Sequence, residues 1–362
     1  MSVKTRNLGR NLTVSEIGLG CMTIGKDYSE NSKREAIKII RRAYELGVTM
    51  FDTAELYAEG KNESLVGEAL HPFRDKIIIA TKCGVMFESG HISGNVSGKM
   101  IMDSRPETIR KSLEGSLKRL QTDYIDLYYI HRVDPKVQIE IVAQTMADLH
   151  GEGKILNWGI SEPGMMTLRK AHAVFPVAAI ESEYNMMWRE PEQEILPALE
   201  ELGIGLVPYR PLARGFLTGA SDGMYLNDAK NTRFDEKNLA ANMALKTFVQ
   251  DLAEKKNVSA AQISLAWLLA QKNFIVPIPG TSKLERMEEN INATNIIFTD
   301  KELINIRELL EQIPIYGERY DPESDNGKRA IAKSINFGLI YGMGANKLST
   351  ELKIPRNDAK NY

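Results

Sequence analysis

The chain has 362 residues, 43% hydrophobic and 26% charged, so it can bury a sizeable core as one large domain or two ordinary ones. Its formal net charge of -2 and the lack of a long basic run argue against nucleic-acid binding. The cysteines Cys21 and Cys83 are too few for a disulfide framework. No run of about 18 apolar residues and no apolar signal segment appear, so we expect a cytoplasmic protein without a membrane partner.

Strand and helix patterns alternate along the chain, after a hairpin at 5–16. The expected strands are short apolar runs at 16–22, 48–52, 76–82, 124–131, 155–161, 177–182, 205–210 and 274–280. The expected helices lie at about 32–46, 62–70, 104–120, 163–173, 191–202, 239–256, 259–271, 283–292 and 300–312, with a further one ending at 150. Ser32 and the stretch 104–107 are predicted to cap their helices. This rhythm predicts an α/β fold, a parallel (β/α)₈ TIM barrel.

Two long segments interrupt the rhythm, at 83–103 and at 211–238. Long loops on the catalytic face of a barrel are usually functional. We expect residues 1–312 to form the barrel domain and residues 313–362 to form a C-terminal extension, which packs on the barrel or at a subunit contact. Gly18 and Gly20 suggest a dinucleotide-binding fingerprint, but Thr23 stands at its third glycine position and no helix opens there.

Four polar residues stand at or just beyond the ends of predicted strands. Asp52, Lys82 and His131 end three of the apolar runs, and Tyr57 follows the first of these within one short turn. Such side chains converge on one face of a barrel. A tyrosine has a pKa of about 10, which a neighbouring ammonium lowers. A carboxylate beside the lysine keeps that ammonium in place, so the group predicts proton transfer by a tuned tyrosine. No cysteine–histidine cluster at metal-ligand spacing appears, and we expect no metal.

Several motifs resemble those of the aldo-keto reductases, over about residues 5–312. The matching segments are SEIGLGCM (15–22), FDTAELYAEGKNESLVGEAL (51–70), IIIATK (77–82), DYIDLYYIHRVD (123–134), GISE (159–162), PYRPLARGFLTG (208–219) and IPGTSKLERMEEN (278–290). The resemblance implies a barrel whose bottom is closed by an N-terminal hairpin, and NADPH-dependent reduction of aldehydes and ketones. It assigns Tyr57 as general acid and Lys82 as the group that lowers its pKa. Asp52 then pairs with Lys82, and His131 orients the carbonyl.

The resemblance also implies a binding site for NADPH or NADP. Ser161 would bind the nicotinamide carboxamide, and Tyr209 would stack on the nicotinamide ring. The pyrophosphate loop and the adenosine site would comprise Pro211, Leu212, Arg214, Gly215, Gly280, Thr281, Lys283, Arg286, Glu289 and Asn290. Lys283 and Arg286 favour NADPH over NADH, because a 2′-phosphate needs cationic donors.

Three cofactor-site residues depart from the usual family pattern. Glu162 stands where many members have asparagine, Glu181 where many have glutamine, and Arg210 where serine is frequent. An ionised carboxylate only accepts hydrogen bonds, so Glu181 is expected to hold the carboxamide NH₂ and to shift relative affinity toward NADP⁺. Arg210 could reach the pyrophosphate or Glu181, or point into solvent.

The substrate is expected to be a small-molecule carbonyl compound, aromatic or aliphatic, in an apolar pocket. Met22, Phe87 and Trp188 are the candidate lining residues, and Met186 and Met187 either join them or pack in the core. Two other functions stay open, because a fold does not settle a function. One is an NADP-binding regulatory subunit like those of potassium channels, with little turnover, and the other is an NADP-dependent alcohol dehydrogenase. The chain could also form a homo-oligomer.

Overall fold

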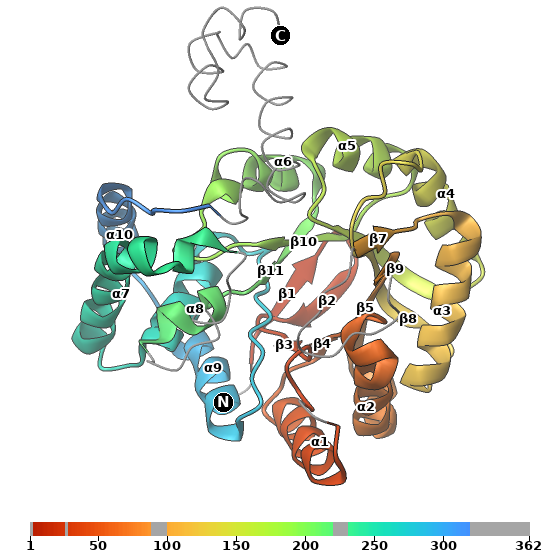
Figure 1. Cartoon of the computed structure of the whole chain (residues 1–362), viewed down its shortest axis with the longest axis horizontal. Helices are drawn as coiled ribbons and strands as arrows, with labels where there is room; N and C mark the ends of the chain where they lie inside the picture. The colour runs from red at the N-terminus through yellow and green to blue at the C-terminus, as the bar shows by residue number, and fades with distance from the viewer. Residues whose placement is uncertain (1–2, 26–27, 88–99, 220–230, 319–362) are drawn as a thin grey trace, which may run out of the picture.

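The computed structural model describes residues 3–25, 28–87, 100–219 and 231–318, with only the backbone of Phe87. Within them, one parallel sheet of seven strands curves round the centre of the molecule, and helices surround it (Figure 1). In chain order its strands are β3 (Leu19–Gly20), β4 (Met50–Asp52), β5 (Ile78–Cys83), β8 (Ile125–Ile130), β9 (Ile155–Ser161), β10 (Ala179–Glu183) and β11 (Gly205–Tyr209). This arrangement confirms the predicted (β/α)₈ barrel.

The segment at 274–280, predicted as the eighth strand, lies between β11 and β3 but is not a regular strand. The N–H groups of Val276 and Ile278 donate to carbonyls of β11. The alternate residues, Pro277 and Pro279, face the β3 side, where their carbonyls accept hydrogen bonds from backbone N–H groups. Proline has no N–H group, so on this side the segment accepts hydrogen bonds but donates none from these two residues. The prediction of a strand was therefore wrong, although the segment occupies the expected place in the barrel.

The helices lie on the outside of the barrel, close to their predicted positions. They are α1 (Glu30–Glu45), α2 (Lys61–Leu70), α3 (Pro106–Leu120), α4 (Ile139–Gly151), α5 (Met165–Val174), α6 (Ile195–Leu202), α7 (Glu236–Lys256), α8 (Ala260–Gln271), α9 (Leu284–Asn292) and α10 (Asp300–Gln312). Two caps differ from prediction. Ser29, and not Ser32, caps α1, and α3 begins after Arg105 without a side-chain cap. In the described part of the chain, no helix combines the length and apolarity needed to cross a membrane.

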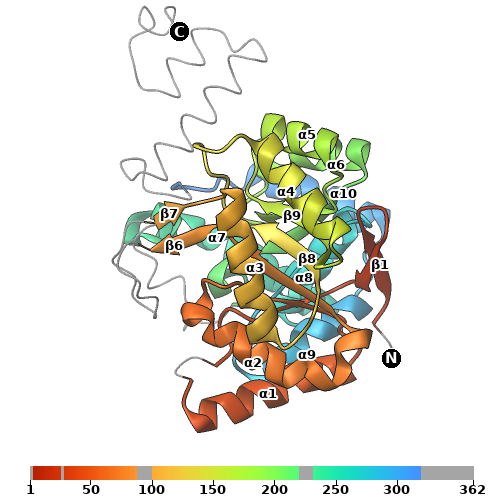
Figure 2. The ribbon, with the colours of Figure 1, turned by 90° about the vertical axis from the view of Figure 1, so that its right-hand side faces the viewer.

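Two antiparallel hairpins lie at opposite ends of the barrel (Figure 2). The first, β1 (Thr5–Leu8) with β2 (Leu12–Ser15), closes the bottom, since Leu8 packs against the first residue of β11. The second, β6 (Val85–Phe87) with β7 (Met100–Met102), stands beyond the carboxyl end of β5, where a long loop was predicted. The site must therefore lie at the end away from β1, where the carboxyl ends of the strands meet.

The barrel interior leaves no room for a side chain at Gly159 in β9. A Cβ atom there would lie 2.4 Å from the Tyr129 ring and 2.5 Å from the Ala179 carbonyl oxygen. We expect Gly159→Ala to destabilise the fold by about 1–3 kcal/mol, measured by chemical denaturation, because backbone and ring must both shift. Gly151→Ala is the matched control, as no atom lies within 4 Å of its added Cβ. Equal stability of the two variants would contradict this.

Candidate active site

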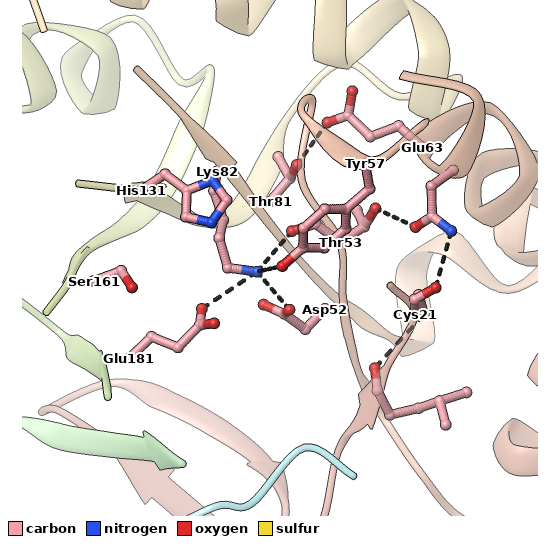
Figure 3. A network of polar contacts seen from close by, with 12 residues as sticks. Cys21, Asp52, Thr53, Tyr57, Glu63, Thr81, Lys82, His131, Ser161 and Glu181 are labelled. Atoms are coloured by element: carbon pink, nitrogen blue, oxygen red, sulfur yellow. Dashed lines mark hydrogen bonds and ion pairs between the residues drawn. The ribbon is translucent and has the colours of Figure 1, made fainter. Parts of the chain in front are cut away.

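Lys82 is the centre of a buried polar cluster formed by the carboxyl ends of β4, β5 and β10 (Figure 3). Its Nζ donates hydrogen bonds to Asp52 Oδ1 at 2.5 Å and to the Thr53 carbonyl at 2.9 Å. It also donates to Tyr57 Oη at 3.4 Å and lies 3.3 Å from Glu181 Oε2. An ammonium has three hydrogens, so the contact with Glu181 is electrostatic. Three of the four predicted catalytic residues thus meet at one nitrogen.

The electrostatics of the cluster keep Lys82 charged and Tyr57 protonated. Burial by itself would lower the pKa of Lys82, but the carboxylates of Asp52 and Glu181 together raise it. Burial raises the pKa of the half-buried Tyr57 to about 12, although Lys82 acts to lower it. The predicted lowering by Lys82 is present but outweighed, because Asp52 and Glu181 also oppose a phenolate. At neutral pH the Tyr57 phenol is therefore protonated and can act as a proton donor.

His131, the fourth predicted catalytic residue, follows β8 directly and faces Tyr57. The two rings meet edge to face, with centroids 6.0 Å apart and planes at 83°. Burial lowers the pKa of His131 well below its usual value, and the cations of Arg132 and Lys82 add to this effect. The imidazole is therefore neutral at pH 7, and its one N–H can donate to an oxygen next to the Tyr57 hydroxyl.

Ser161 ends β9 and is buried beside the cluster (Figure 3). Its Oγ accepts a hydrogen bond of 2.8 Å from Nη1 of Arg132, the residue after His131. Arg132 was not predicted as a site residue, since a charged residue just after a strand is usually solvated. Its position directly after His131 was the one feature of the sequence that could have indicated a place in the site.

Glu162 holds Tyr209, the residue predicted to stack on the nicotinamide ring, through a hydrogen bond. Its Oε1 accepts hydrogen bonds from Tyr209 Oη at 2.9 Å and from the backbone N–H of Glu183 at 3.0 Å. The Glu162 backbone has a φ of 55°, in the left-handed region that asparagine tolerates better than glutamate. The side chain thus fixes the ring of Tyr209, a role that the sequence did not reveal.

Glu183 contacts two arginines, one just before the long segment predicted at 211–238 and one near its end. Its Oε1 accepts a 2.9 Å hydrogen bond from Nη2 of the buried Arg233, and its Oε2 lies 3.5 Å from Nη1 of Arg210. Arg210 therefore pairs with Glu183 and not with Glu181, one of its predicted partners. The Arg233 guanidinium also lies over Trp188, 5.0 Å from the ring centroid. Glu183 and Arg233 were both missed, although Glu183 shares a strand face with Glu181.

The remaining predicted site residues differ in how far they are exposed. Met22 is 54% exposed and Trp188 is half-buried, whereas Met186 and Met187 are buried and belong to the core. The side chain of Phe87 lies outside the described residues. Gly280 lies beside Gly20, so the predicted adenosine site on α9 adjoins β3 at its carboxyl end. Among the residues in the described ranges, no cluster of histidine, cysteine, aspartate or glutamate is suited to hold a metal ion.

The residues just past the closing segment form a polar edge at the start of α9. Lys283 and Arg286 are exposed, Thr281 and Glu289 are half-buried, and Asn290 is buried. Thr281 Oγ1 accepts a 3.2 Å hydrogen bond from the N–H of Lys283. Of the residues predicted for the pyrophosphate loop, Pro211 is buried, while Leu212, Arg214 and Gly215 are half-buried.

Comparison with known proteins agrees with this geometry. Residues 16–311 match the model of the Aldo/keto reductase family. The chain is 40% identical over 310 residues to a probable aldo-keto reductase 1 from Glycine max, covering 83% of this chain and 86% of that protein. It is 37% identical over 332 residues to the aldo-keto reductase yakc [NADP(+)] of Schizosaccharomyces pombe, covering 89% and 96%. The chain belongs to the aldo-keto reductases, a family of oxidoreductases.

A solved structure supports the same assignment. The glycerol dehydrogenase of Gluconobacter oxydans superposes with a TM-score of 0.77 and 28% sequence identity, over 90% of this chain and 99% of that one. The predicted family and barrel are thereby confirmed.

The C-terminal segment matches a different family. Residues 317–362 match the model of DNA polymerase family A, a likeness that was not predicted from the sequence. This match covers a minor part of the chain, so it does not place the chain in that family. It begins just beyond the end of the aldo-keto reductase match, near the predicted boundary at residue 312. The predicted packing of this extension concerns residues that lie almost entirely outside the described ranges.

Proposed function

We propose that the protein reduces an aldehyde or ketone to an alcohol with NADPH, with Tyr57 as the proton donor. The observation that carries the proposal is the position of Tyr57. Its hydroxyl lies 3.4 Å from the Lys82 ammonium, and the residue is half-buried, so part of it is open to contact by a substrate. A neutral imidazole, that of His131, stands beside it.

The protein residues supply the proton and the orientation. As negative charge develops on the carbonyl oxygen, Tyr57 donates its phenolic proton, and the nearby Lys82 ammonium stabilises the phenolate that remains. Asp52 keeps Lys82 in place through the 2.5 Å hydrogen bond. The His131 N–H donates to the same substrate oxygen and so fixes its direction. The high pKa of Tyr57 favours the acid form, which is the form that reduction requires.

The residues around this site fit the cofactor by their chemistry. NADPH, when bound, supplies the hydride. Lys283 and Arg286 are exposed cations at the amino end of α9, where backbone N–H groups also favour an anion. Tyr209 is half-buried, and its hydroxyl donates to Glu162, the residue after Ser161, so its ring is held at the same end of the barrel as Ser161. The NADP(+) in the name of the similar yeast protein supports the same choice.

The direct test is NADPH consumption at about 340 nm with a panel of aldehydes and ketones. We expect turnover with at least one aromatic or aliphatic aldehyde, since Met22 and Trp188 are the apolar residues proposed to line the substrate pocket. NADPH binding without turnover on any carbonyl would count against the proposal and favour a regulatory subunit. Turnover only with alcohols and NADP⁺ would favour a dehydrogenase.

Cofactor choice is expected to depend on two exposed cations. Replacing Lys283 and Arg286 together with methionine should weaken NADPH binding by about 10–100-fold, because two charge-assisted contacts to a phosphate are lost. Binding of NADH, which lacks the 2′-phosphate, should change little. Fluorescence titration with both cofactors measures this. Lys301→Met, an exposed cation on α10, is the control, and an equal loss of NADH affinity would exclude phosphate recognition by these residues.

A further inference from the structure

Glu181 is a second carboxylate on the Lys82 ammonium. Its Oε2 lies 3.3 Å from Lys82 Nζ, whose three hydrogens go to Asp52, Thr53 and Tyr57. Glu181 is 4% exposed and Asp52 is 2% exposed. Oε2 of Glu181 and Oδ2 of Asp52 are both buried and have no hydrogen-bond partner among the described residues. Two buried carboxyl groups thus share one cation, and full ionisation of both leaves an excess negative charge.

The other groups around Glu181 do not remove this excess charge. Its neighbours in the sheet are Ser161 on β9 and Val207 on β11, neither of which is charged. The titratable or charged groups that interact with it are Asp52 on β4, Tyr57 after β4, Lys82 on β5, Tyr129 on β8 and Arg132 after β8. The Tyr129 hydroxyl is buried and has no partner within the described residues. Arg132 is the second cation, and it already donates to Ser161 and to the His131 carbonyl.

We propose that Glu181 is a positioning residue that competes with Tyr57 for the Lys82 ammonium and so keeps the Tyr57 phenol protonated in alkaline solution. The proposal rests on the proposed role of Tyr57 as proton donor. It assigns to the carboxylate a task that a glutamine at this position could not perform. A neutral amide leaves the ammonium free to stabilise a phenolate.

The order of ionisation explains how this works. Burial, with the Asp52 carboxylate, raises the pKa of Glu181 to about 8, so Glu181 loses its proton well before Tyr57 does. Below that pH Glu181 is a neutral acid that can donate a hydrogen bond, as a glutamine would. Above it, the new negative charge sits on the same ammonium as Tyr57 and opposes a second negative charge there. The site therefore stays a proton donor over a wider pH range.

The experiment is an NMR titration of the protein without cofactor, labelled with ¹³C at tyrosine Cζ. The Tyr57 signal is assigned by its absence in Tyr57→Phe. In Glu181→Gln we expect the pKa of Tyr57 to fall by about one unit or more, the size of shift that a neighbouring charge causes. Glu181→Asp keeps the charge and should titrate like the parent protein. Glu181→Leu provides the same comparison if the glutamine variant does not fold.

A control variant and a second readout separate this effect from a general perturbation of the fold. Glu192→Gln removes a carboxyl group whose pKa burial also raises, but which contacts Tyr184 outside the cluster, and it should leave the Tyr57 titration unchanged. The pH profile of carbonyl reduction gives a second readout, in which the alkaline decline of kcat should move to lower pH in Glu181→Gln. An unchanged Tyr57 pKa in Glu181→Gln, or an equal fall in Glu192→Gln, would overturn the proposal. If no carbonyl is reduced at all, the NMR titration still decides the role of Glu181, so the two proposals fail separately.

Discussion

Replacing Tyr57 with phenylalanine is expected to lower kcat for carbonyl reduction by about 10²–10⁴-fold, the usual contribution of a positioned proton donor. The reason is that the phenol is the one group in the cluster that combines a transferable proton with access to a substrate. Lys82 is fully buried, and His131 is neutral at pH 7, so its N–H can donate a hydrogen bond but does not readily transfer its proton. Steady-state NADPH consumption measures kcat, and fluorescence titration measures NADPH affinity, which should change little.

Tyr316→Phe is the matched control for this experiment, because Tyr316 is 47% exposed and lies beyond α10, outside the cluster. It should retain the activity of the parent protein. A Tyr57→Phe variant with more than about one tenth of the parent kcat would show that another group, or water, delivers the proton.

Replacing Lys82 with methionine is expected to abolish reduction and also to destabilise the fold by about 3–5 kcal/mol, as the loss of one partner from a buried ion pair does. Without the ammonium, the carboxyl groups of Asp52 and Glu181 must be protonated to stay buried, so their pKa values rise further. Stability is then lost as the pH rises through those values, since the unfolded chain ionises freely. Chemical denaturation at about pH 6 and pH 9 should show the larger deficit at pH 9.

A double variant separates the two effects of this substitution. Lys82→Met combined with Asp52→Asn removes one of the carboxylates, so it should recover part of the stability but none of the activity. A Lys82→Met protein as stable as the parent at alkaline pH would mean that the carboxylates find other partners, and would contradict the network described above.

The sequence was sufficient to predict that Asp52, Tyr57, Lys82 and His131 lie together, because local rules connect strand ends with one face of the barrel. Asp52 and Lys82 fall at the ends of clear apolar runs, His131 follows another, and parallel strands bring such positions together whatever the loops do. The sequence could not show which effect on the pKa of Tyr57 is the largest. A nearby lysine predicts a lowered pKa, whereas burial and the charge of Glu181, which depend on the packed barrel, raise it.

Ion pairs between residues that are far apart in the sequence were predicted less well. Glu183 and Arg233 form a buried ion pair at 2.9 Å, yet nothing local links a strand end with a residue far along a loop. Arg210 was expected to reach the pyrophosphate or Glu181, or to point into solvent, and only the path of the chain after β11 brings it to Glu183 instead.

What the sequence alone determined was the order of elements, the family and the chemical type of each candidate catalytic residue, since periodicity and motif spacing are local properties. The tertiary structure decided which carboxylate meets which cation, and that Pro277 and Pro279 keep the closing segment from forming a regular strand. It also decided that Glu181 shares Lys82 with Tyr57. These outcomes depend on distances of a few ångströms in a low-dielectric interior, where burial and charge compete, and only packing sets those distances.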